Sequence, residues 1–137
     1  MNGGKSTDRE NSNPAESGRD IASGIQRGAI YLAALLDCSG EGGKISRPVL
    51  VIQNDVGNRY SRSIIVARVT SKAIASHFPV IVEIPRGTLS GIAAICLNQV
   101  ITLDKGSLRE KIADLPPETM ADVDKALLVS LGLPRGG

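Results

Sequence analysis

The sequence predicts a mainly β fold, a small antiparallel β-barrel with short helices and a C-terminal α-helix. Several short segments rich in Val, Ile and Leu follow one another, separated by turns that contain glycine or proline. This pattern is typical of neighbouring antiparallel strands. Apolar residues at helical spacing stand out only near the end of the chain. A length of 137 residues leaves room for one such domain and an extension.

Residues 1–26 are predicted to be a disordered extension. They are rich in Asn, Ser, Gly, Asp and Glu, and Ile21 and Ile25 are almost their only aliphatic side chains. So little apolar area cannot offset the entropy lost when a chain becomes ordered. The folded domain is therefore expected to span residues 27–134, with 135–137 as a flexible tail.

The first half of the domain is expected to contain three strands. Ala29–Leu36 is an apolar run that predicts a buried first strand, and the glycine-rich stretch 37–46 predicts a flexible loop. Pro48–Asn54 is β-branched and predicts the second strand, and Ser63–Thr70 predicts the third. Residues 55–62 contain a Gly-Asn turn signal, so a wide antiparallel connection is expected between these two strands.

The second half is expected to hold further strands and then the helix. Phe78–Ile84 predicts a fourth strand, and 92–103 predicts two short strands with a bend near Asn98. Ser107–Glu110 matches a capping box and predicts a single helical turn. A clearer helix is predicted over Glu118–Leu131, ended by Gly132 and Pro134; its apolar face is Met120, Val123, Leu127, Leu128 and Leu131.

The formal net charge of +2 conceals one strongly basic stretch. Residues 44–72 give +5, because Asp55 is the one acid against six basic residues: Lys44, Arg47, Arg59, Arg62, Arg68 and Lys72. Such clustering suits a partner that carries phosphates. On charge alone, a solvated surface whose charges balance in three dimensions is an equal alternative.

Other features of the sequence indicate the cellular compartment in which the protein is expected. No stretch approaches the roughly 20 apolar residues that span a bilayer, and no secretory signal pattern opens the chain. Cys38 and Cys96 set neither a disulfide framework nor a zinc spacing, so a cytosolic protein with reduced thiols is expected. Cys96 lies in an apolar run and is expected to be a small core residue.

Four segments carry a recognisable order and spacing. They are Arg27-Gly-Ala-Ile-Tyr31, Arg47-Pro-Val-Leu-Val-Ile-Gln-Asn-Asp-Val-Gly-Asn58, Ile65-Val-Ala-Arg-Val-Thr-Ser71 and Leu97-Asn-Gln-Val-Ile-Thr-Leu-Asp-Lys105. Read together with the C-terminal segment 123–133, they resemble the MazF/PemK family of toxins. The resemblance covers residues 27–133, and the block that begins at Arg47 is its most specific part.

The resemblance implies an SH3-like β-barrel of the PemK-like and CcdB-like kind. It also implies a cytoplasmic homodimer that is neutralised by an acidic antitoxin peptide of the MazE/PemI kind. The implied activity is sequence-specific cleavage of single-stranded RNA (mRNA) without a metal or any other cofactor. Cleavage of this type leaves 2′,3′-cyclic phosphate and 5′-OH ends and stops translation and growth.

The resemblance further implies Arg47 and Thr70 as the catalytic pair. A guanidinium stays charged and can hold two phosphate oxygens at once, so Arg47 is expected to stabilise the transition state. The Thr70 hydroxyl is expected to donate to the same phosphate, and Glu41 is the candidate general base. His77 is the single histidine, which excludes an acid–base pair of histidines. Without the family, each of these residues has an ordinary structural explanation.

Five residues are candidates for substrate binding: Ser46, Asn54, Ser71, Gln99 and Tyr60. The two amides can read base edges of an unstacked strand, although a buried amide that bonds the backbone is an equal alternative for each. Tyr60 can stack on a base, and Ser71 can contact phosphate or base. Arg68 stands where the family usually has a small residue, so either an extra phosphate contact or an altered dimer seam is expected there.

Two other functions remain open on the sequence. A catalytically degenerate family member would bind RNA or its antitoxin without cutting. A non-enzymatic poison of DNA gyrase, as in the related CcdB group, would use an aromatic anchor at its C-terminus. The tail Leu133–Gly137 contains no aromatic residue, which disfavours the gyrase alternative.

Overall fold

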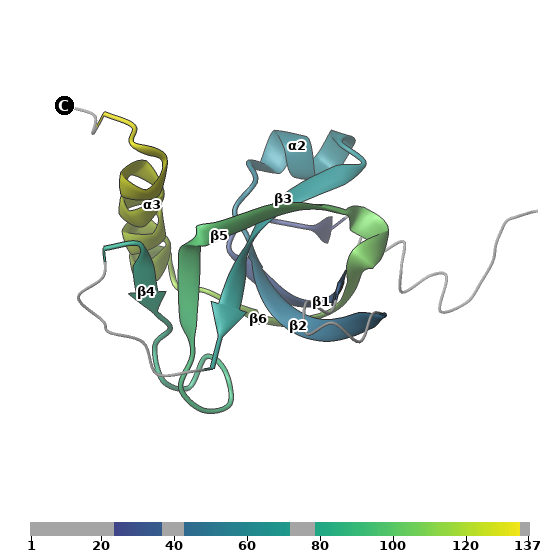
Figure 1. Cartoon of the computed structure of the whole chain (residues 1–137), viewed down its shortest axis with the longest axis horizontal. Coiled ribbons are helices and arrows are strands. Elements are labelled where there is room, and N and C mark those ends of the chain that lie inside the picture. The colour runs from purple at the N-terminus through teal and green to yellow at the C-terminus, as the bar shows by residue number, and fades with distance from the viewer. Residues whose placement is uncertain (1–23, 37–42, 72–78, 135–137) are drawn as a thin grey trace, which may run out of the picture.

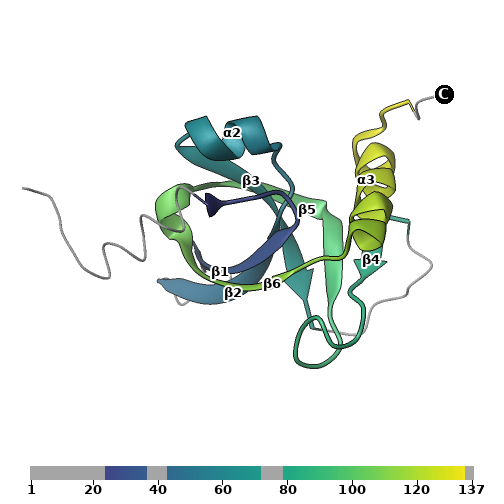
Figure 2. The ribbon, with the colours of Figure 1, turned by 180° about the vertical axis from the view of Figure 1, so that it is seen from behind.

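A computed structural model of the chain describes residues 24–36, 43–71 and 79–134. Six strands form one antiparallel sheet in the order β4-β5-β3-β2-β1-β6. The strands are β1 (Ala29–Leu36), β2 (Lys44–Val51), β3 (Ser63–Thr70), β4 (Ile81–Glu83), β5 (Ala94–Asp104) and β6 (Leu108–Asp114). The sheet curls into an open barrel, and its hydrogen-bonded ladder does not close between β4 and β6 (Figures 1 and 2). The predicted mainly β fold is confirmed.

Three short helical elements complete the described part of the fold. They are α2 (Asp55–Tyr60), the 3-10 turn η1 (Lys105–Ser107) and the C-terminal helix α3 (Pro117–Leu131). Helix α3 packs beside β4 and β5 at one end of the molecule, and α2 lies over the start of β3 (Figure 1). Within the described residues, no helix is long and apolar enough to cross a membrane.

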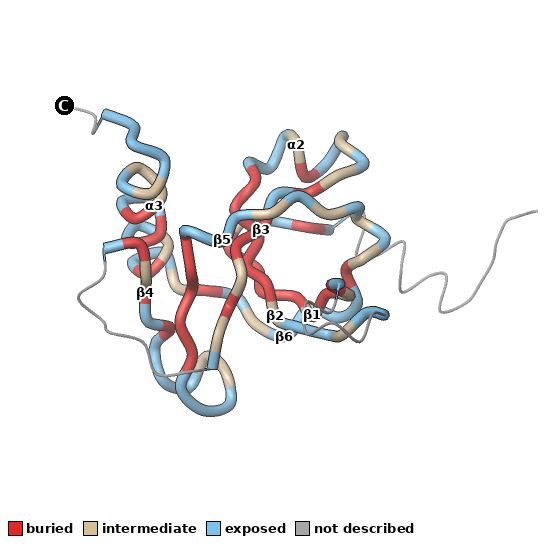
Figure 3. Tube along the Cα trace, viewed as in Figure 1, coloured by how far each residue is buried: buried red, intermediate tan, exposed pale blue. Residues whose placement is uncertain are grey.

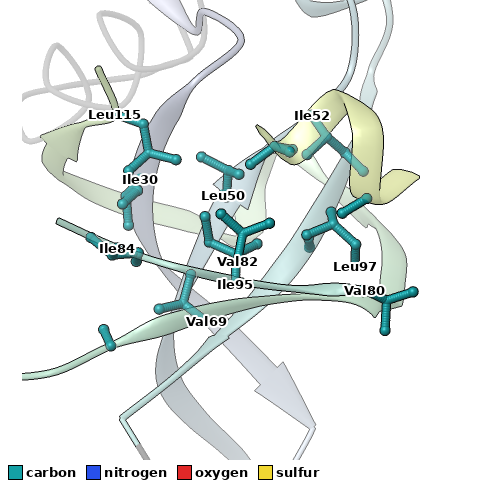
Figure 4. Packing of buried hydrophobic residues seen from close by; sticks show 14 residues of the cluster. Ile30, Leu50, Ile52, Val69, Val80, Val82, Ile84, Ile95, Leu97 and Leu115 are labelled. Carbon is teal, nitrogen blue, oxygen red and sulfur yellow. The ribbon is translucent and has the colours of Figure 1, made fainter. Parts of the chain in front are cut away.

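The strand alternation supplies two hydrophobic cores on opposite faces of the sheet. Along β1, Ala29, Tyr31 and Ala33 join the cluster enclosed by the curled strands, while Ile30 between them joins the other cluster. That second cluster lies between the sheet and helix α3, which contributes Val123 (Figure 4). Buried residues gather in β1, β3, the second half of β2 and the first half of β5, whereas β6, much of the loops and the outer side of α3 are mostly exposed (Figure 3).

Several element boundaries match the prediction. β1 and β3 begin and end at the predicted residues, and α3 begins one residue earlier than expected, at Pro117. Gly132 ends α3 with a left-handed backbone, φ 69°, which a glycine adopts without strain. The predicted apolar face of α3 is only partly right, because Leu131 is 60% exposed and Thr119 and Ala126 are buried instead.

The second and fourth strands differ from their predicted bounds. β2 begins at Lys44 and ends at Val51, so Pro48 lies inside the strand rather than at its start. The ring is tolerated because β2 pairs with β1 at Pro48 but pairs with β3 only from Val49 onward. β4 covers only Ile81–Glu83, and Phe78, where the fourth strand was expected to begin, lies outside the described residues.

The predicted antiparallel pair of the second and third strands with a wide connection is confirmed, but a helix in that connection and a strand that begins at Leu108 were not predicted. The connection after β2 is the helix α2, whose N-cap Asn54 accepts a hydrogen bond from the Gly57 backbone N–H. The stretch Ser107–Glu110 is not a helical turn, because the chain enters strand β6 at Leu108 and pairs with β1. In β6, Leu108 packs in the core enclosed by the strands, and Ala113 packs against the other core. Two such residues form a weaker sequence pattern than the capping box.

β5 is one strand with a bulge rather than two short strands. Its register with β3 jumps between Ala67↔Val100 and Arg68↔Cys96, so residues 97–99 are extra. The bend expected near Asn98 is therefore confirmed. Ile25, which the sequence placed in the extension, is buried in the barrel core, while residues 1–23 and 135–137 lie outside the described residues.

Candidate functional site

A groove of about 760 Å³ opens where β2 and β3 lie side by side beyond their paired segment. The β4–β5 loop closes one side of it, next to the end of β3 (Figures 1 and 2). The lining residues are Arg47, Pro48, Arg68, Val69, Thr70, Ser71, Leu89, Ser90, Ile92, Ala93, Cys96, Gln99 and Ile112. A smaller hollow of about 470 Å³ between β4 and α3 contains charges of both signs and none of the predicted site residues.

Strand register brings Arg47 and Thr70 together. Val49 pairs with Arg68, and continuing this antiparallel register by two residues places Arg47 opposite Thr70. Both residues line the groove, on the same face of the two strands. The backbone pairing of β2 with β3 ends at Val49 and Arg68, and the groove opens beyond it, so a phosphate group in the groove can contact both side chains.

The groove is electropositive. Arg47 and Arg68 line it, and no Asp or Glu is among those of its lining residues that the structure describes. Within the described part of the chain, no hydrogen bond or ion pair joins either guanidinium to another residue. Two guanidinium groups without a carboxylate partner favour the binding of an anion.

The bulge in β5 delivers a polar side chain to this groove. Residues 97–99 are the extra residues of β5, and Gln99 lines the groove. The bulge is held in place because the Leu97 backbone N–H donates to the Val80 carbonyl at 2.8 Å and the Ser130 hydroxyl donates to the Leu97 carbonyl at 2.7 Å. Bulges commonly redirect a side chain towards a site in this way.

The rest of the groove is apolar, and sequence reasoning missed this part. Leu89, Ile92 and Ile112 line it, and Ile92 is 63% exposed. An exposed isoleucine at the edge of a glycine-rich loop is the sequence signal that could have indicated a binding wall. Cys96 is buried as predicted, and burial raises the pKa of its thiol.

Several predicted site residues lie elsewhere. The Asn54 side chain caps α2 by accepting from the Gly57 N–H at 2.8 Å, and it is not among the lining residues of the groove. Tyr60, 75% exposed at the end of α2, is also not among them, and the Arg59 guanidinium lies 5.5 Å from its ring centroid. Ser46 is exposed next to Arg47 but does not line the groove. Glu41 lies outside the described residues.

The end of the specific block from Arg47 to Asn58 builds the turn at α2. Asn58 is fully buried and donates to the Gln53 carbonyl at 2.8 Å and to the Asp55 carboxylate at 3.0 Å. The Gln53 side-chain amide donates to the Asn58 side-chain oxygen at 3.2 Å and to the Ser63 carbonyl at 3.1 Å. Gly57 lies close to this network, and an added Cβ would lie 3.1 Å from the Gln53 side chain, which would have to shift.

Arg27 connects this turn to the rest of the domain. Its backbone N–H donates to the Asp55 carboxylate at 2.7 Å, and its Nε donates to the Ile52 carbonyl at 2.8 Å. Its Nη2 forms an ion pair with Asp124 of α3, also at 2.7 Å. Arg27 therefore has a structural explanation. Among the described residues, no group of three His, Cys, Asp or Glu side chains could hold a metal ion.

A model of PemK-like, MazF-like toxins of type II toxin–antitoxin systems matches residues 26–131 of the chain. The chain belongs to this toxin family. The match covers every strand of the sheet and the whole of α3. Of the described residues, 24–25 and 132–134 lie outside it. The resemblance in the four sequence segments is thereby confirmed.

Solved structures of toxins of this family have a similar fold. An endoribonuclease from a mycobacterial species is 25% identical with a TM-score of 0.68, over 82% of this chain and 95% of that one. A mycobacterial endoribonuclease in complex with its cognate antitoxin is 26% identical with a TM-score of 0.67, over 82% and 99%. A MazE–MazF complex from Deinococcus radiodurans is 27% identical with a TM-score of 0.65, over 80% and 98%.

Proposed function

We propose that this PemK/MazF-like toxin is a metal-independent, sequence-specific endoribonuclease that cuts single-stranded mRNA and thereby inhibits translation and growth. The observation that supports the proposal is that Arg47 and Thr70 lie on one face of a groove in which no carboxylate is among the described lining residues. The proposal is also supported by the endoribonucleases of known structure that share the fold at 25% and 26% identity.

The chemistry assigned to this pair is transesterification. The ribose 2′-OH gives up its proton while its oxygen attacks the adjacent phosphorus. The P–O5′ bond breaks, the leaving 5′-oxygen takes up a proton from solvent, and the products are a 2′,3′-cyclic phosphate and a 5′-OH. Negative charge grows on the non-bridging oxygens as the phosphorane forms. Arg47 stabilises that charge through two parallel N–H donors, and Thr70 donates its hydroxyl to the same phosphate.

The proton from the 2′-OH requires an acceptor. Arginine keeps its proton at any working pH, so Arg47 is assigned to charge stabilisation and not to general-base catalysis. Glu41 is the predicted base, and Glu41→Gln is the variant that tests it. If Glu41 accepts the proton, this neutral isostere should lower kcat about 10²-fold or more with little change in KM.

Recognition of the substrate is assigned to the other residues of the groove. Gln99 presents an amide that can bond a base edge, and Ser71 can contact the phosphate or the base next to Thr70. The apolar wall at Leu89 and Ile92 offers a surface for the face of an unstacked base. An Ile92→Ser variant should accordingly change the cleavage preference more than the maximal rate.

The partners belong to the same proposal. We assign the protein to the cytoplasm, as a homodimer neutralised by a cognate acidic antitoxin peptide of the MazE/PemI kind. A related mycobacterial endoribonuclease forms a complex with its cognate antitoxin, and MazF from Deinococcus radiodurans forms one with MazE. A carboxylate-rich segment would find two guanidinium groups in the groove, and its occupation would exclude RNA.

The deciding experiment incubates purified protein with a long single-stranded RNA in excess EDTA and maps the ends of the fragments. Cleavage should persist in EDTA, occur at one short sequence, and leave 2′,3′-cyclic phosphate and 5′-OH ends. Arg47→Ala should abolish it while the protein stays folded. RNA binding without cleavage on any sequence would indicate a degenerate member, and gyrase poisoning without RNA cleavage would indicate CcdB-like action.

A further inference from the structure

We propose that Arg68 is a second phosphate-binding residue, which holds the phosphate that flanks the scissile one. This inference rests on the proposed function, because it assumes that a single RNA strand occupies the groove. It concerns a residue to which neither the catalytic pair nor the fold gives a role.

The position of Arg68 is fixed by two neighbouring strands. It pairs with Val49 of β2 on one side and with Cys96 of β5 on the other. Thr70 lies two residues further along β3, on the same face of the strand. Arg47 is the diagonal neighbour of Arg68 across the β2–β3 pair, and such neighbours lie roughly 7–8 Å apart. This separation allows two anionic groups of one strand to be bound side by side.

The surroundings of Arg68 favour the binding of an anion. Its side chain is half-buried in the groove, and its cross-strand neighbours Val49 and Cys96 are buried and uncharged. No carboxylate is among the lining residues, and no ion pair holds Arg68 in the part of the chain that the structure describes. A partly desolvated guanidinium without a counter-ion is unfavourable, and a bound phosphate would remove that cost.

The bulge of β5 supports the same conclusion. The register between β3 and β5 shifts just beside Arg68, so the extra residues 97–99 begin next to its partner Cys96. Gln99 of that bulge lines the same groove as Arg68. One nucleotide could thus have its phosphate held by Arg68 while its base is read by Gln99, which would fix the register of the strand relative to Arg47.

The test measures binding and cleavage separately. Binding is followed by fluorescence anisotropy with an uncleavable 2′-O-methyl version of the mapped site, over a series of salt concentrations. The variants are Arg68→Gln, which keeps a polar side chain without charge, Arg68→Lys, which keeps the charge, and Arg62→Gln as the control. Arg62 lies just before β3, is exposed, and does not line the groove.

Arg68→Gln should weaken binding about tenfold or more near physiological salt, because it removes a charge-assisted contact. The slope of log Kd against log salt should fall by about 0.7, the value for one phosphate contact on a single strand. Arg68→Lys should retain the wild-type slope, and Arg62→Gln should change neither Kd nor slope. Circular dichroism checks that each variant is folded, and if Arg68→Gln is not, Arg68→Met replaces it.

A neutral methylphosphonate identifies the phosphate concerned. Placed singly on either side of the scissile position, it should weaken binding to the wild type on one side only, and it should have no further effect in Arg68→Gln. Equal salt slopes, or an unchanged methylphosphonate effect in the variant, would overturn the inference. So would a loss of binding that follows a weakened dimer, because Arg68 would then belong to the seam between subunits.

Failure of the proposed function has a different signature. If the wild type binds RNA and shows the Arg68-dependent slope but never cuts, the endoribonuclease proposal fails, and Arg68 remains a phosphate-binding residue of an RNA-binding groove. If the wild type cuts RNA and the salt slope is independent of Arg68, the endoribonuclease proposal stands and the assignment of Arg68 fails. Absence of both binding and cleavage would overturn the two together.

Discussion

The groove at Arg47 and the turn at Asn58 lie towards opposite ends of β3, and they hold their polar groups in opposite ways. In the turn, Asn58 and Gln53 bond each other and the backbone, and the network is buried. In the groove, no hydrogen bond or ion pair joins Arg47 or Arg68 to another described residue, so both guanidinium groups are open to a ligand. Satisfied polar groups stabilise a fold, whereas unsatisfied ones at a surface are available for binding.

This difference divides one continuous sequence block into two roles. The block from Arg47 to Asn58 is the most specific part of the family resemblance, yet only its first residue points to chemistry. Its last residues shape α2 and fix where β3 begins. Substitutions in the groove should therefore change the reaction, and substitutions in the turn should change the stability.

The largest effect is expected for Arg47→Ala. Removal of one preorganised donor to a developing oxyanion lowers kcat by about 10²–10³-fold. The thermal midpoint should stay within about 2 °C of the wild type, because Arg47 is exposed and no described residue pairs with it. Single-turnover cleavage and a thermal melt measure the two quantities. Equal loss of activity in Arg62→Gln would show that general charge, and not the groove, is responsible.

In the turn, the variant Asn58→Ala should lose stability and keep its activity. Loss of this side chain leaves the Gln53 carbonyl without its Asn58 donor and the Gln53 amide with the Ser63 carbonyl alone, which should lower the free energy of unfolding by about 2–3 kcal/mol. Urea denaturation measures it, and the activity per folded molecule should be unchanged. A variant as stable as the wild type but inactive would place Asn58 in the reaction and contradict the division.

Asn54→Ala gives a smaller effect in the same region. Asn54 caps a helix at an exposed position, so its removal should cost about 1 kcal/mol of stability. Asn54 was predicted to read a base edge, and end-mapping of the cut sites tests that prediction directly. An altered cleavage preference in this variant would support the base-reading role in place of the capping role.

A similar contrast, between local patterns and tertiary contacts, explains which elements could be predicted from the sequence alone. β1 and β3 were predicted to the residue because a buried strand between turns is a local pattern, legible without its neighbours. β6 was missed because Leu108 and Ala113 are its only core-facing apolar residues, and pairing with β1 rather than local preference makes it a strand. Tertiary pairing of this kind leaves little trace in a short segment.

The predicted site residues also divide into those that the structure brings to the groove and those that it does not. Arg47 and Thr70 were assigned from the resemblance, and both line one groove together with Ser71, which follows Thr70, and Gln99, which was chosen for its amide. Asn54 and Tyr60 were assigned because amides and rings suit RNA, but their place depends on α2, which the sequence presented as a turn. The apolar wall at Ile92 was missed because the sequence placed Ile92 at the start of a strand, whereas β5 begins at Ala94 and leaves Ile92 in the loop that lines the groove.

A moderate effect is expected for Thr70→Val, which removes the hydroxyl and keeps the β-branched shape. Loss of one hydrogen bond to the phosphate should lower kcat about tenfold, well below the effect of removing the Arg47 charge. Thr70→Ser keeps the hydroxyl and should recover most of the rate. If valine and serine variants are equally active, Thr70 contributes only to the strand.

The smallest effect is expected where the two regions are linked, at the ion pair between Arg27 and Asp124. Their side chains are 28% and 55% exposed, so water and salt screen the attraction, and Asp124→Asn should cost less than about 1 kcal/mol. Arg27→Met should cost more, because the Nε bond to the Ile52 carbonyl is lost as well. Neither variant should change the cleavage site or rate, since this pair lies on α3 and the start of β1, away from the groove lining. If Asp124→Asn slows cleavage, the packing of α3 controls the geometry of the groove, and the separation between structural and catalytic polar groups would not hold at this point.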